Sequence, residues 1–464
     1  MEQLFYHWAG EECQSRMQMT ANGSNRMYYR LKGETRSCIA AINMDVRENE
    51  AFFYFAEQLH GKGVKVPRLY AISVDRTMYL QEDLGDVTIY NYIQSRKTNG
   101  VDVLPYMRQW YTTAIDKLIE MQDKCSDIEY SCSYPRPSFD RQALMWDFNY
   151  FKYYFLKLFH IPFDEQLLER DFNLLCDYLL SDECNYFVHR DFQSRNIMVV
   201  GDELYFIDFQ GARKGSQYYD VAALLYSSKS DLPDTLRKEL LQHFLEKTTS
   251  RDSDVAGRTR MFYAYVLARI MQAMGAYGYR GVIEKKDYFI KSIPFAVNNL
   301  RKIIEDGYFP EGVSHLVEVM HSIVEMPEYK TEKEGLSVSV FSFSYRKEIP
   351  FDKSGNGGGF VFDCRLLPNP GLYEEYRTLN GRDKPVVDFF LNHPEVETYL
   401  DNVKKIVSQA IESYVKRGYT RLMLNFGCTG GRHRSVYCAE QIAKFIRQNY
   451  SCNVLLYHLE QGRL

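Results

Sequence analysis

The chain has 464 residues and a formal net charge of −4 at pH 7, and 45% of its residues are hydrophobic. This length predicts about two or three folding units, because single hydrophobic cores rarely extend beyond about 250 to 300 residues. The slightly negative charge argues against a surface devoted to nucleic acid, and no apolar run reaches the roughly 18 residues of a membrane span.

The cysteines and the first residues indicate a reducing compartment. None of the ten cysteines forms a Cys-x-x-Cys pair, and the ten histidines do not join them at zinc-ligand spacings. Residues 1–5 have neither the basic opening nor the long apolar stretch of a secretory signal. We therefore expect a cytoplasmic protein whose cysteines are mostly core thiols.

Residues 1–88 predict a small β-rich lobe, and residues 89–325 predict a mainly helical lobe. The first lobe has a helix pattern at 47–60 and strand patterns at 27–31, 38–42, 69–73 and 78–81. The second has short strand patterns at 187–189, 197–200 and 204–207. Its long helices are expected at 106–122, 147–159, 236–247, 258–274 and 287–304. This order predicts an α+β fold with two lobes.

A polar stretch without apolar periodicity, residues 326–336, predicts a linker to a separate domain at 337–464. The domain is expected to contain a glycine-rich turn at 355–359 and helices at 401–416 and from 435 to about 448. Its strand patterns lie at 337–343, 360–363 and 421–426. Strand, helix, strand, glycine-rich loop and helix together predict an α/β unit.

One segment of the helical lobe carries the pattern H-x-D-x-x-x-x-N, from His189 through Asp191 to Asn196, and Asp208 follows twelve residues later. Phosphoryl transfer requires a carboxylate that accepts the proton of the attacking hydroxyl and metal ions that neutralise phosphoryl charge. The spacing therefore predicts a kinase with Asp191 as catalytic base and Asn196 and Asp208 as magnesium ligands. Any one of these residues alone would be an ordinary loop cap. Their joint spacing between strand patterns favours the kinase.

Four passages make residues 1 to about 325 similar to the aminoglycoside phosphotransferase and choline kinase family. They are Gly23-Ser24-Asn25-Arg26-Met27-Tyr28-Tyr29-Arg30-Leu31, Met44-Asp45, Glu82-Asp83-Leu84-Gly85-Asp86, and Asp208-Phe209-Gln210 with Tyr219-Asp220. Within the family, the likeness is closest to the anomeric N-acetylmuramate and N-acetylglucosamine kinases of cell-wall recycling. This resemblance implies a bilobal protein-kinase-like fold, ATP and Mg²⁺ as cofactors, and a small-molecule sugar acceptor.

The same resemblance implies positions for the nucleotide. Gly23 and Ser24 belong to the turn over the ATP phosphates, and backbone groups from Glu82 to Leu84 form the hinge that meets the adenine edge.

The strand at 38–42 departs from the kinase pattern because it carries no lysine to hold the α- and β-phosphates. Arg26 or Arg30 would supply the missing charge by the family pattern, and the alternative is that both are surface arginines. Without that charge the domain would be a nucleotide-binding pseudokinase. The intact base and metal ligands favour an active kinase.

The phosphate acceptor is less well defined by the sequence. The helix around Trp146, Asp147, Tyr150 and Tyr154 lies where the family builds its acceptor pocket, although core packing explains the aromatic residues equally well. Asp147 is the candidate acceptor residue. An aminoglycoside, choline or homoserine remains an alternative to an amino sugar.

The loop Cys428-Thr429-Gly430-Gly431-Arg432-His433-Arg434-Ser435 follows a strand and opens a helix. Its glycines, consecutive amides and helix N-terminus suit a phosphate or a similar anion, and Arg434 would add a bidentate partner. A structural turn is the plain alternative. The spacing from Cys428 to Arg434 also fits the phosphate cradle of protein tyrosine phosphatases, with Cys428 as nucleophile.

Three motifs make residues 336–464 similar to the C-terminal domain of the bacterial RNase adapter RapZ, which senses glucosamine-6-phosphate. They are Phe362-Asp363-Cys364-Arg365-Leu366-Leu367-Pro368-Asn369-Pro370, Gly381-Arg382-Asp383-Lys384-Pro385-Val386, and the loop at 427–435. The likeness implies that an amino-sugar phosphate is bound without turnover by Asp363, Cys428, Thr429, Gly430, His433 and Arg434. Gly371 stands where the family carries a larger side chain, and the end of the chain lacks its lysine- and arginine-rich tail. We therefore do not expect RNA binding.

Together, the two halves predict an amino-sugar kinase of cell-wall recycling fused to a domain that senses an amino-sugar phosphate. A kinase for another hydroxylated metabolite is the enzymatic alternative. A pseudokinase that acts as a signalling or RNA-binding adapter is the alternative from a different class.

Overall fold

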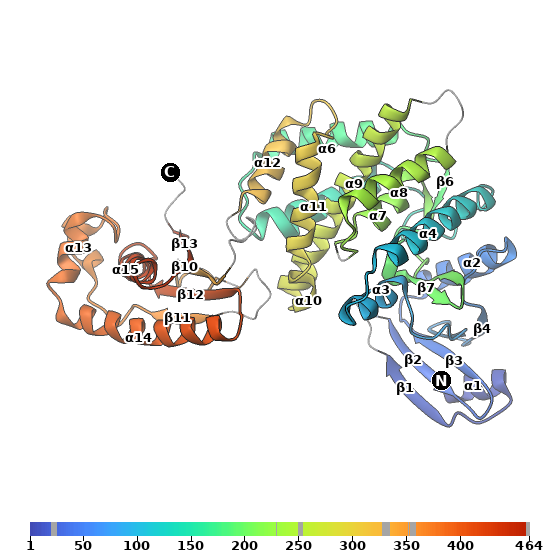
Figure 1. Ribbon diagram of the computed structural model, residues 1–464, viewed down its shortest axis with the longest axis horizontal. Helices are drawn as coiled ribbons and strands as arrows, with labels where there is room; N and C mark the ends of the chain where they lie inside the picture. The colour runs from blue at the N-terminus through green and yellow to red at the C-terminus, as the bar shows by residue number, and fades with distance from the viewer. Residues whose placement is uncertain are drawn as a thin grey trace. The chain divides into compact units, whose positions relative to one another are not determined.

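The computed structural model describes residues 1–19, 26–228, 230–248, 254–326, 335–350, 352 and 359–460. Gly23 and Ser24, most of the expected linker, and most of the turn expected at 355–359 lie outside these residues. Contacts divide the chain into an N-terminal unit (Met1–Glu284 with Ser292–Ile323) and a C-terminal unit (Lys285–Lys291 with Val324–Leu464), and Figure 1 traces their elements in order. The domain boundaries expected from the sequence stay a prediction.

The N-terminal unit begins with a five-stranded antiparallel sheet in the order β1-β2-β3-β5-β4. Its strands are β1 (Ser15–Met19), β2 (Met27–Lys32), β3 (Ser37–Ile42), β4 (Leu69–Ile72) and β5 (Met78–Gln81). Helix α2 (Val46–Gly61) packs beside it, and its Asp45 N-cap accepts hydrogen bonds from two backbone N–H groups of the first turn. Helix α1 (Glu2–Ala9) and β1 were not expected from the sequence, but Phe5 of α1 is fully buried in the sheet's core.

The second lobe is helical, with two small strand pairs, β6 with β9 and β7 with β8. The strands are β6 (Tyr186–Val188), β7 (Ile197–Val200), β8 (Glu203–Phe206) and β9 (Arg213–Gly215). The helices are α3 (Ile89–Thr98), α4 (Leu104–Lys124), α5 (Arg141–Phe151), the π-helix η1 (Lys152–Lys157), α6 (Glu165–Leu180), α7 (Tyr218–Leu225), α8 (Asp234–Lys247), α9 (Val255–Gly278), α11 (Ile293–Asp306) and α12 (Ser314–Val324).

The helix expected at 287–304 is two helices, α10 (Asp287–Ile290) and α11. Pro294 lies in the first turn of α11, where its missing N–H needs no partner, so the chain restarts a helix there. None of the helices in the described ranges combines the length and apolarity that a membrane-spanning helix needs.

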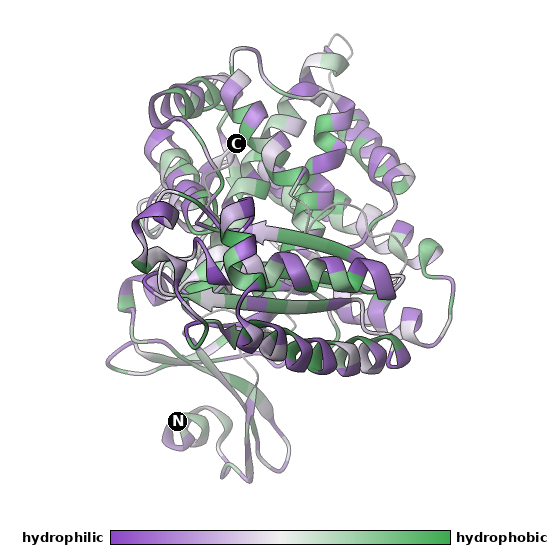
Figure 2. Ribbon diagram, turned by 90° about the vertical axis from the view of Figure 1, so that its left-hand side faces the viewer, coloured by the Kyte–Doolittle hydropathy of each residue, from purple (hydrophilic) through white to green (hydrophobic). Residues whose placement is uncertain are grey.

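The C-terminal unit is a four-stranded parallel sheet in the order β11-β12-β10-β13, with helices packed on it (Figure 1). Its strands are β10 (Ser337–Ser344), β11 (Phe360–Asp363), β12 (Arg421–Cys428) and β13 (Asn453–His458). Helices α13 (Lys384–Leu391), α14 (Pro394–Lys416) and α15 (Arg434–Asn449) follow the chain, and α14 begins seven residues earlier than expected because Pro394 opens it. Hydrophilic and hydrophobic residues alternate along the helices, as Figure 2 shows, which is typical of helices that pack on one face.

Helix α9 crosses close to the end of α5 and to η1, which follows α5 directly. A Cβ added at Gly278 would lie 1.7 Å from the carbonyl oxygen of Tyr154, and one at Gly275 would lie 2.9 Å from the backbone of Tyr150 and Phe151. Side chains at these two positions would therefore push apart the elements that carry Asp147 and Arg269.

We predict that Gly278→Ala lowers the free energy of unfolding of the N-terminal unit by about 1 to 3 kcal/mol, the usual cost of overpacking. Gly61→Ala is the matched control, because an added Cβ there has open space, and its change should stay within about 0.5 kcal/mol. Trp8, Trp110 and Trp146 all lie in the N-terminal unit, so urea unfolding followed by tryptophan fluorescence reports on this unit alone. Equal unfolding midpoints for the two variants would contradict the close crossing.

Candidate functional site

Asp220 holds the backbone of the H-x-D segment. Its fully buried carboxylate accepts the N–H groups of His189 and Arg190 at 2.6 and 2.9 Å. Arg190 has a φ of 77°, a left-handed conformation that is strained for a residue other than glycine. The two hydrogen bonds keep that conformation and so fix where the next residue, Asp191, points.

Asp191 is the half-buried carboxylate of this loop. Burial alone would raise its pKa, but the positive charges of Arg190, Arg269 and Arg195 outweigh burial and hold the pKa below its usual value. Asp191 is therefore ionised at neutral pH. It can orient a hydroxyl and accept its proton.

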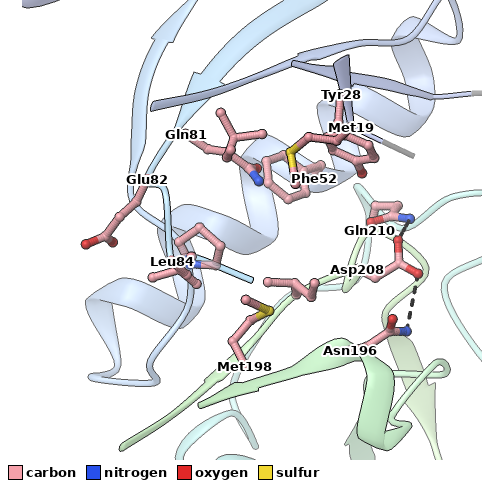
Figure 3. Close-up of a pocket in the computed structure, with 14 residues that line it drawn as sticks. Met19, Tyr28, Phe52, Gln81, Glu82, Leu84, Asn196, Met198, Asp208 and Gln210 are labelled. Carbon is pink, nitrogen blue, oxygen red and sulfur yellow. Dashed lines mark hydrogen bonds between the residues drawn. The ribbon is translucent and has the colours of Figure 1, made fainter. Parts of the chain in front are cut away.

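Asp208 lies between two side-chain amides, as Figure 3 shows. Gln210 donates to its Oδ1 at 2.8 Å, and the amide nitrogen of Asn196 lies 3.4 Å from its Oδ2. Asn196 also donates to the backbone carbonyl of Asp191 at 2.8 Å, which ties the two ends of the motif together. The structure thus places Asp191, Asn196 and Asp208 at one site.

A pocket of about 230 Å³ opens beside Asp208 between the sheet and the β7–β8 hairpin. Its polar end carries Asn196, Asp208 and Gln210 (Figure 3). Gln81, Glu82 and Gly85 also line it, and its other lining side chains are apolar or aromatic, namely Met19, Tyr28, Ile39, Phe52, Pro67, Leu84, Met198 and Ile207. An apolar slot that ends in a carboxylate suits a flat ring joined to a charged tail.

The chain after β5 provides free backbone groups at the pocket rim. The N–H of Glu82 donates to the Arg68 carbonyl, whereas the carbonyl of Glu82 and the N–H of Leu84 have no hydrogen-bond partner among the described residues. These two groups are an acceptor and a donor two residues apart. They match the edge of an adenine ring.

Arg30 does not line this pocket, contrary to the phosphate contact predicted for it. Its guanidinium bonds to Asp83 at 2.8 and 2.9 Å, to Asp86 at 2.9 and 3.0 Å, and to the Gly85 carbonyl at 3.1 Å. The hydrogen bonds that Arg30 donates to Asp86 raise the pKa of Arg30 above its usual value. Its charge is therefore used to fix the hinge, and it is not available to phosphates.

Arg26 occupies a different position, buried beside the pocket. Its Nη2 lies 3.2 Å from Oε2 of Glu48 in α2, and its guanidinium lies over the Phe52 ring at 5.9 Å. Asn43, just after β3, donates to the same Oε2 of Glu48 at 2.7 Å. An arginine just before β2 and an asparagine just after β3 thus both contact the helix carboxylate that a lysine would pair with in kinases. Sequence reasoning missed Glu48 and Asn43, which carry no motif of their own.

Asp147 lies on α5, at 3.8 Å from Arg190, so the structure brings the predicted acceptor residue next to the catalytic loop. Burial raises its pKa, against the pull of Arg190 and Arg269. Trp146 is half exposed, while Tyr150 and Tyr154 pack on each other and on Tyr279. The two tyrosines are thus explained by packing, whereas Trp146 is exposed and the Asp147 side chain keeps 16% of its surface exposed.

In the C-terminal unit, the ends of three parallel strands bring the predicted anion loop together. Asp363 ends β11 opposite Gly427, and Ser344 ends β10 opposite Cys428. Ser344 also donates to the carbonyl of Thr429 at 2.7 Å. Ligands of open α/β sheets bind at this carboxyl edge. The N–H groups of residues 429–433 donate no hydrogen bond within the described part of the chain, so they can meet an anion.

Two side chains of this loop are engaged in ways that the sequence did not predict. Arg434 is 6% exposed and donates to the carbonyls of Arg365 and Leu367 at 2.9 and 3.2 Å, so it supports the neighbouring chain. His433 lies 2.9 Å from the carbonyl of Tyr376.

The other three predicted side chains also have partners within the unit. The hydroxyl of Thr429 accepts from Nη2 of Arg434 at 3.4 Å. Asp363 is paired with Arg365 at 2.6 Å. Cys428 is buried with its Sγ 3.1 Å from Oγ of Ser435. Backbone amides, more than side chains, remain for a ligand.

Two family models match separate parts of the chain. The model of the phosphotransferase enzyme family matches residues 18–256, just over half of the chain. The model of the RapZ C-terminal domain matches residues 336–461. A nucleotide-binding protein of Thermodesulfovibrio yellowstonii is 39% identical over 130 residues, which are 28% of this chain and 44% of that protein. The chain spans less than half the length of the curated relatives that it matches.

Among solved structures, an ethanolamine kinase of Plasmodium vivax is 14% identical with a TM-score of 0.46, covering 64% of this chain and 85% of its own. The choline kinase LicA of Streptococcus pneumoniae is 15% identical with a TM-score of 0.41, covering 65% and 97%.

We predict that Asp220→Asn lowers the free energy of unfolding of the N-terminal unit by about 1 to 3 kcal/mol, because an amide accepts only one of two buried N–H groups. Phosphoryl transfer should fall by about 100-fold, since the loop that carries Asp191 shifts. Asp171→Asn is the control, because Asp171 is equally buried and accepts the Leu316 N–H at 2.8 Å, away from this loop. It should lose stability and keep its transfer rate below the unfolding temperature. Equal rates for both variants would remove Asp220 from this role.

Proposed function

The chain belongs to the phosphotransferase enzyme family, and on this premise we propose that it transfers the γ-phosphoryl group of ATP to a hydroxyl of a small molecule. One observation carries the proposal. Asp191, Asn196 and Asp208 converge at the polar end of a pocket whose rim presents free backbone groups of Glu82 and Leu84. This reaction needs a base, oxygen ligands for a metal ion, and groups that bind the edge of the adenine ring.

Asp191 acts on the acceptor hydroxyl. The hydroxyl oxygen forms a bond to the γ-phosphorus, the bond from that phosphorus to the β–γ bridging oxygen breaks, and the hydroxyl proton passes to the Asp191 carboxylate. Because the pKa of Asp191 is below its usual value, it receives the proton late and contributes mainly by orienting the hydroxyl. ADP leaves with the bridging oxygen.

Asp208 and Asn196 fit a magnesium ion, because a carboxylate and an amide oxygen are hard ligands and Mg²⁺ takes its remaining ligands from water and phosphates. Bound there, the ion would neutralise charge on the phosphates. Gln210 keeps the Asp208 carboxylate oriented through its hydrogen bond to Oδ1.

Arg26 supplies the positive charge that the strand lysine provides elsewhere. It lies next to Phe52 and Tyr28, which line the pocket, and Glu48 holds it in place. A buried, permanently charged guanidinium at this position supports an active kinase over a pseudokinase. The ion pair with Glu48 matches the lysine and glutamate pair that active kinases require.

For the acceptor we propose an amino sugar, N-acetylmuramate or N-acetylglucosamine, phosphorylated at the anomeric hydroxyl during cell-wall recycling in the cytoplasm. The passages around Arg26, Glu82 and Asp208 support this choice, and Asp147 beside Arg190 provides a carboxylate for a sugar hydroxyl. Aminoglycosides, choline and homoserine are the alternative acceptors.

For the C-terminal unit we propose that it binds an amino-sugar phosphate without turning it over. The unpaired N–H groups of residues 429–433 support binding of an anion, and the match to the RapZ C-terminal domain supports this class of ligand. A nucleotide is the second ligand to consider, because the curated relatives are named nucleotide-binding proteins.

We expect the full chain to consume ATP with N-acetylmuramate or N-acetylglucosamine, and Asp191→Asn to lower turnover by roughly 100-fold or more. Asp202→Asn is the control, because Asp202 is an exposed carboxylate in the turn between β7 and β8. Coupled ADP release measures both variants against the two sugars, choline, homoserine and an aminoglycoside. Turnover of Asp191→Asn within threefold of the parent would show that Asp191 is not the base.

In the C-terminal unit, we expect Gly430→Ala to weaken binding of glucosamine-6-phosphate about tenfold without loss of stability. An added Cβ at Gly430 meets nothing within 4 Å, so it lies in the open space that a ligand would fill. Calorimetry without ATP measures the affinity, with Gln409→Ala on the exposed side of α14 as control. Binding equal in both variants would place the ligand elsewhere.

The same samples distinguish a sensor from a phosphatase. We expect no release of phosphate from glucosamine-6-phosphate or from p-nitrophenyl phosphate. Release that disappears in Cys428→Ser would establish Cys428 as a nucleophile.

A further inference from the structure

Three arginines from three separate elements lie near the catalytic loop, where Arg213 pairs across the strands with Val188 and donates to the Gly211 carbonyl at 3.1 Å. Arg190 precedes Asp191 in the loop, Arg213 begins β9, and Arg269 lies in α9. Only Arg190 has a motif beside it in the sequence. The other two come from distant segments, so their approach to the site is visible only in the fold.

Two aromatic rings connect Arg213 to Arg269. Arg213 lies over the ring of Phe139 at 5.1 Å, Phe139 packs on Tyr219 with ring centroids 4.3 Å apart, and Arg269 lies over Tyr219 at 5.1 Å. Arg269 also donates to the Tyr219 hydroxyl at 3.0 Å. Tyr219 is the neighbour of Asp220, so this stack is anchored to the residue that holds the catalytic loop.

Among the described residues, no carboxylate at contact distance compensates the charge of Arg213. Burial opposes the charge of Arg269, but Tyr219, Asp191 and Asp147 raise its pKa. The two residues are 2% and 7% exposed. Within the described ranges, no carboxylate lies within 4.0 Å of either guanidinium, and Nη2 of Arg213 and Nε of Arg269 have no hydrogen-bond partner. A buried cation without a charged partner is costly, so a site that keeps Arg213 suits a charge that arrives with a ligand.

The nearby carboxylates are already in use. Asp220 accepts two backbone N–H groups, and Asp191 is required for the hydroxyl. Asp147 faces Arg190 at 3.8 Å. Burial and repulsion from Arg190 lower the pKa of Arg213 to about 10, so its guanidinium remains protonated at neutral pH. Positive charge is therefore left over beside the catalytic base.

We propose that the phosphate acceptor carries an acidic group, a carboxylate or a phosphate, which Arg213 binds together with Arg190 beside Asp191. This inference rests on the proposed kinase function and names its acceptor class. Choline and aminoglycosides are cations, which the same arginines would repel. An acidic sugar instead replaces the missing partner of a buried guanidinium by a charge-assisted hydrogen bond.

The test compares N-acetylmuramate with N-acetylglucosamine, which lacks its lactyl carboxylate, and with N-acetylglucosamine 6-phosphate. We expect the parent to prefer at least one acidic sugar over the neutral one in kcat/KM by about 10-fold or more. Arg213→Gln should reduce that preference about 10-fold, mainly through KM, and Arg213→Lys should restore part of it. Arg141→Gln is the control, because Arg141 lies on α5 like Asp147 but binds Asp177 and Asn173.

Two results would overturn the proposal while leaving the kinase function intact. One is a parent that prefers the neutral sugar over both acids, and the other is an unchanged preference in folded Arg213→Gln. The choice between the two acidic sugars identifies the acidic group.

If no sugar is phosphorylated, the amino-sugar function fails, and binding then decides the inference separately. Thermal unfolding followed by tryptophan fluorescence reports on the N-terminal unit alone. The unfolding midpoint of the parent should rise with an acidic sugar, relative to sodium chloride at equal ionic strength, and that of Arg213→Gln should not. No rise in the parent would refute an acidic ligand here.

Discussion

Asp220 accepts hydrogen bonds from two backbone N–H groups, and the catalytic half of the molecule depends on this interaction. A loop that carries a base must present it at a fixed angle, and here that angle requires a left-handed φ at Arg190, which an arginine does not adopt without support. Asp220 provides the support from inside α7, where it is fully buried. Burial raises the pKa of Asp220 to about 7. The loop is therefore held by the geometry of these short hydrogen bonds more than by the negative charge of Asp220. The adjacent Tyr219 extends the same support to Arg269, so one turn of helix organises both the base and the positive charge around it.

The nucleotide side of the site shows how a missing lysine is replaced without losing its geometry. Kinases need a cation near the phosphates and a helix carboxylate that positions it. In this chain the cation is Arg26, just before β2, and the carboxylate is Glu48 of α2, while Asn43 follows β3 and donates a hydrogen bond to the same carboxylate. Arg30, four residues further along and inside β2, is held at the hinge by Asp83 and Asp86. Two arginines at and within one strand thus have separate tasks.

Site residues that lie close together along the chain could be predicted from the sequence, whereas site residues from distant segments could not. Asp191, Asn196 and Asp208 are recognisable because a loop and a hairpin fix their spacing along the chain. Three of the four strands of the C-terminal unit were expected from their sequence patterns, whereas β13 was not. Arg213 and Arg269 could not be found in this way, because a buried arginine looks like a surface arginine until the elements around it are packed. The side chains of Arg434 and His433 were assigned to a ligand from their residue types, whereas nearby carbonyls occupy them. A donor that lies near unsatisfied backbone carbonyls is used first by the protein.

The two units would hold anions by different physical means, and the difference fits different tasks. In the N-terminal unit, the buried guanidinium of Arg213 has no carboxylate partner among the described residues, which is costly and favours a ligand whose charge is desolvated beside a reacting hydroxyl. In the C-terminal unit, neutral backbone N–H groups at a strand edge cost little when empty, because two of the residues that carry them, Thr429 and Gly430, are exposed to water. An empty sensor must be stable for long periods, whereas an enzyme meets its substrate continually. Joining both in one chain keeps them in equal number, and on the proposed functions the product of the first unit belongs to the ligand class of the second. A sugar phosphate released by the kinase would therefore meet a receptor at a raised effective concentration.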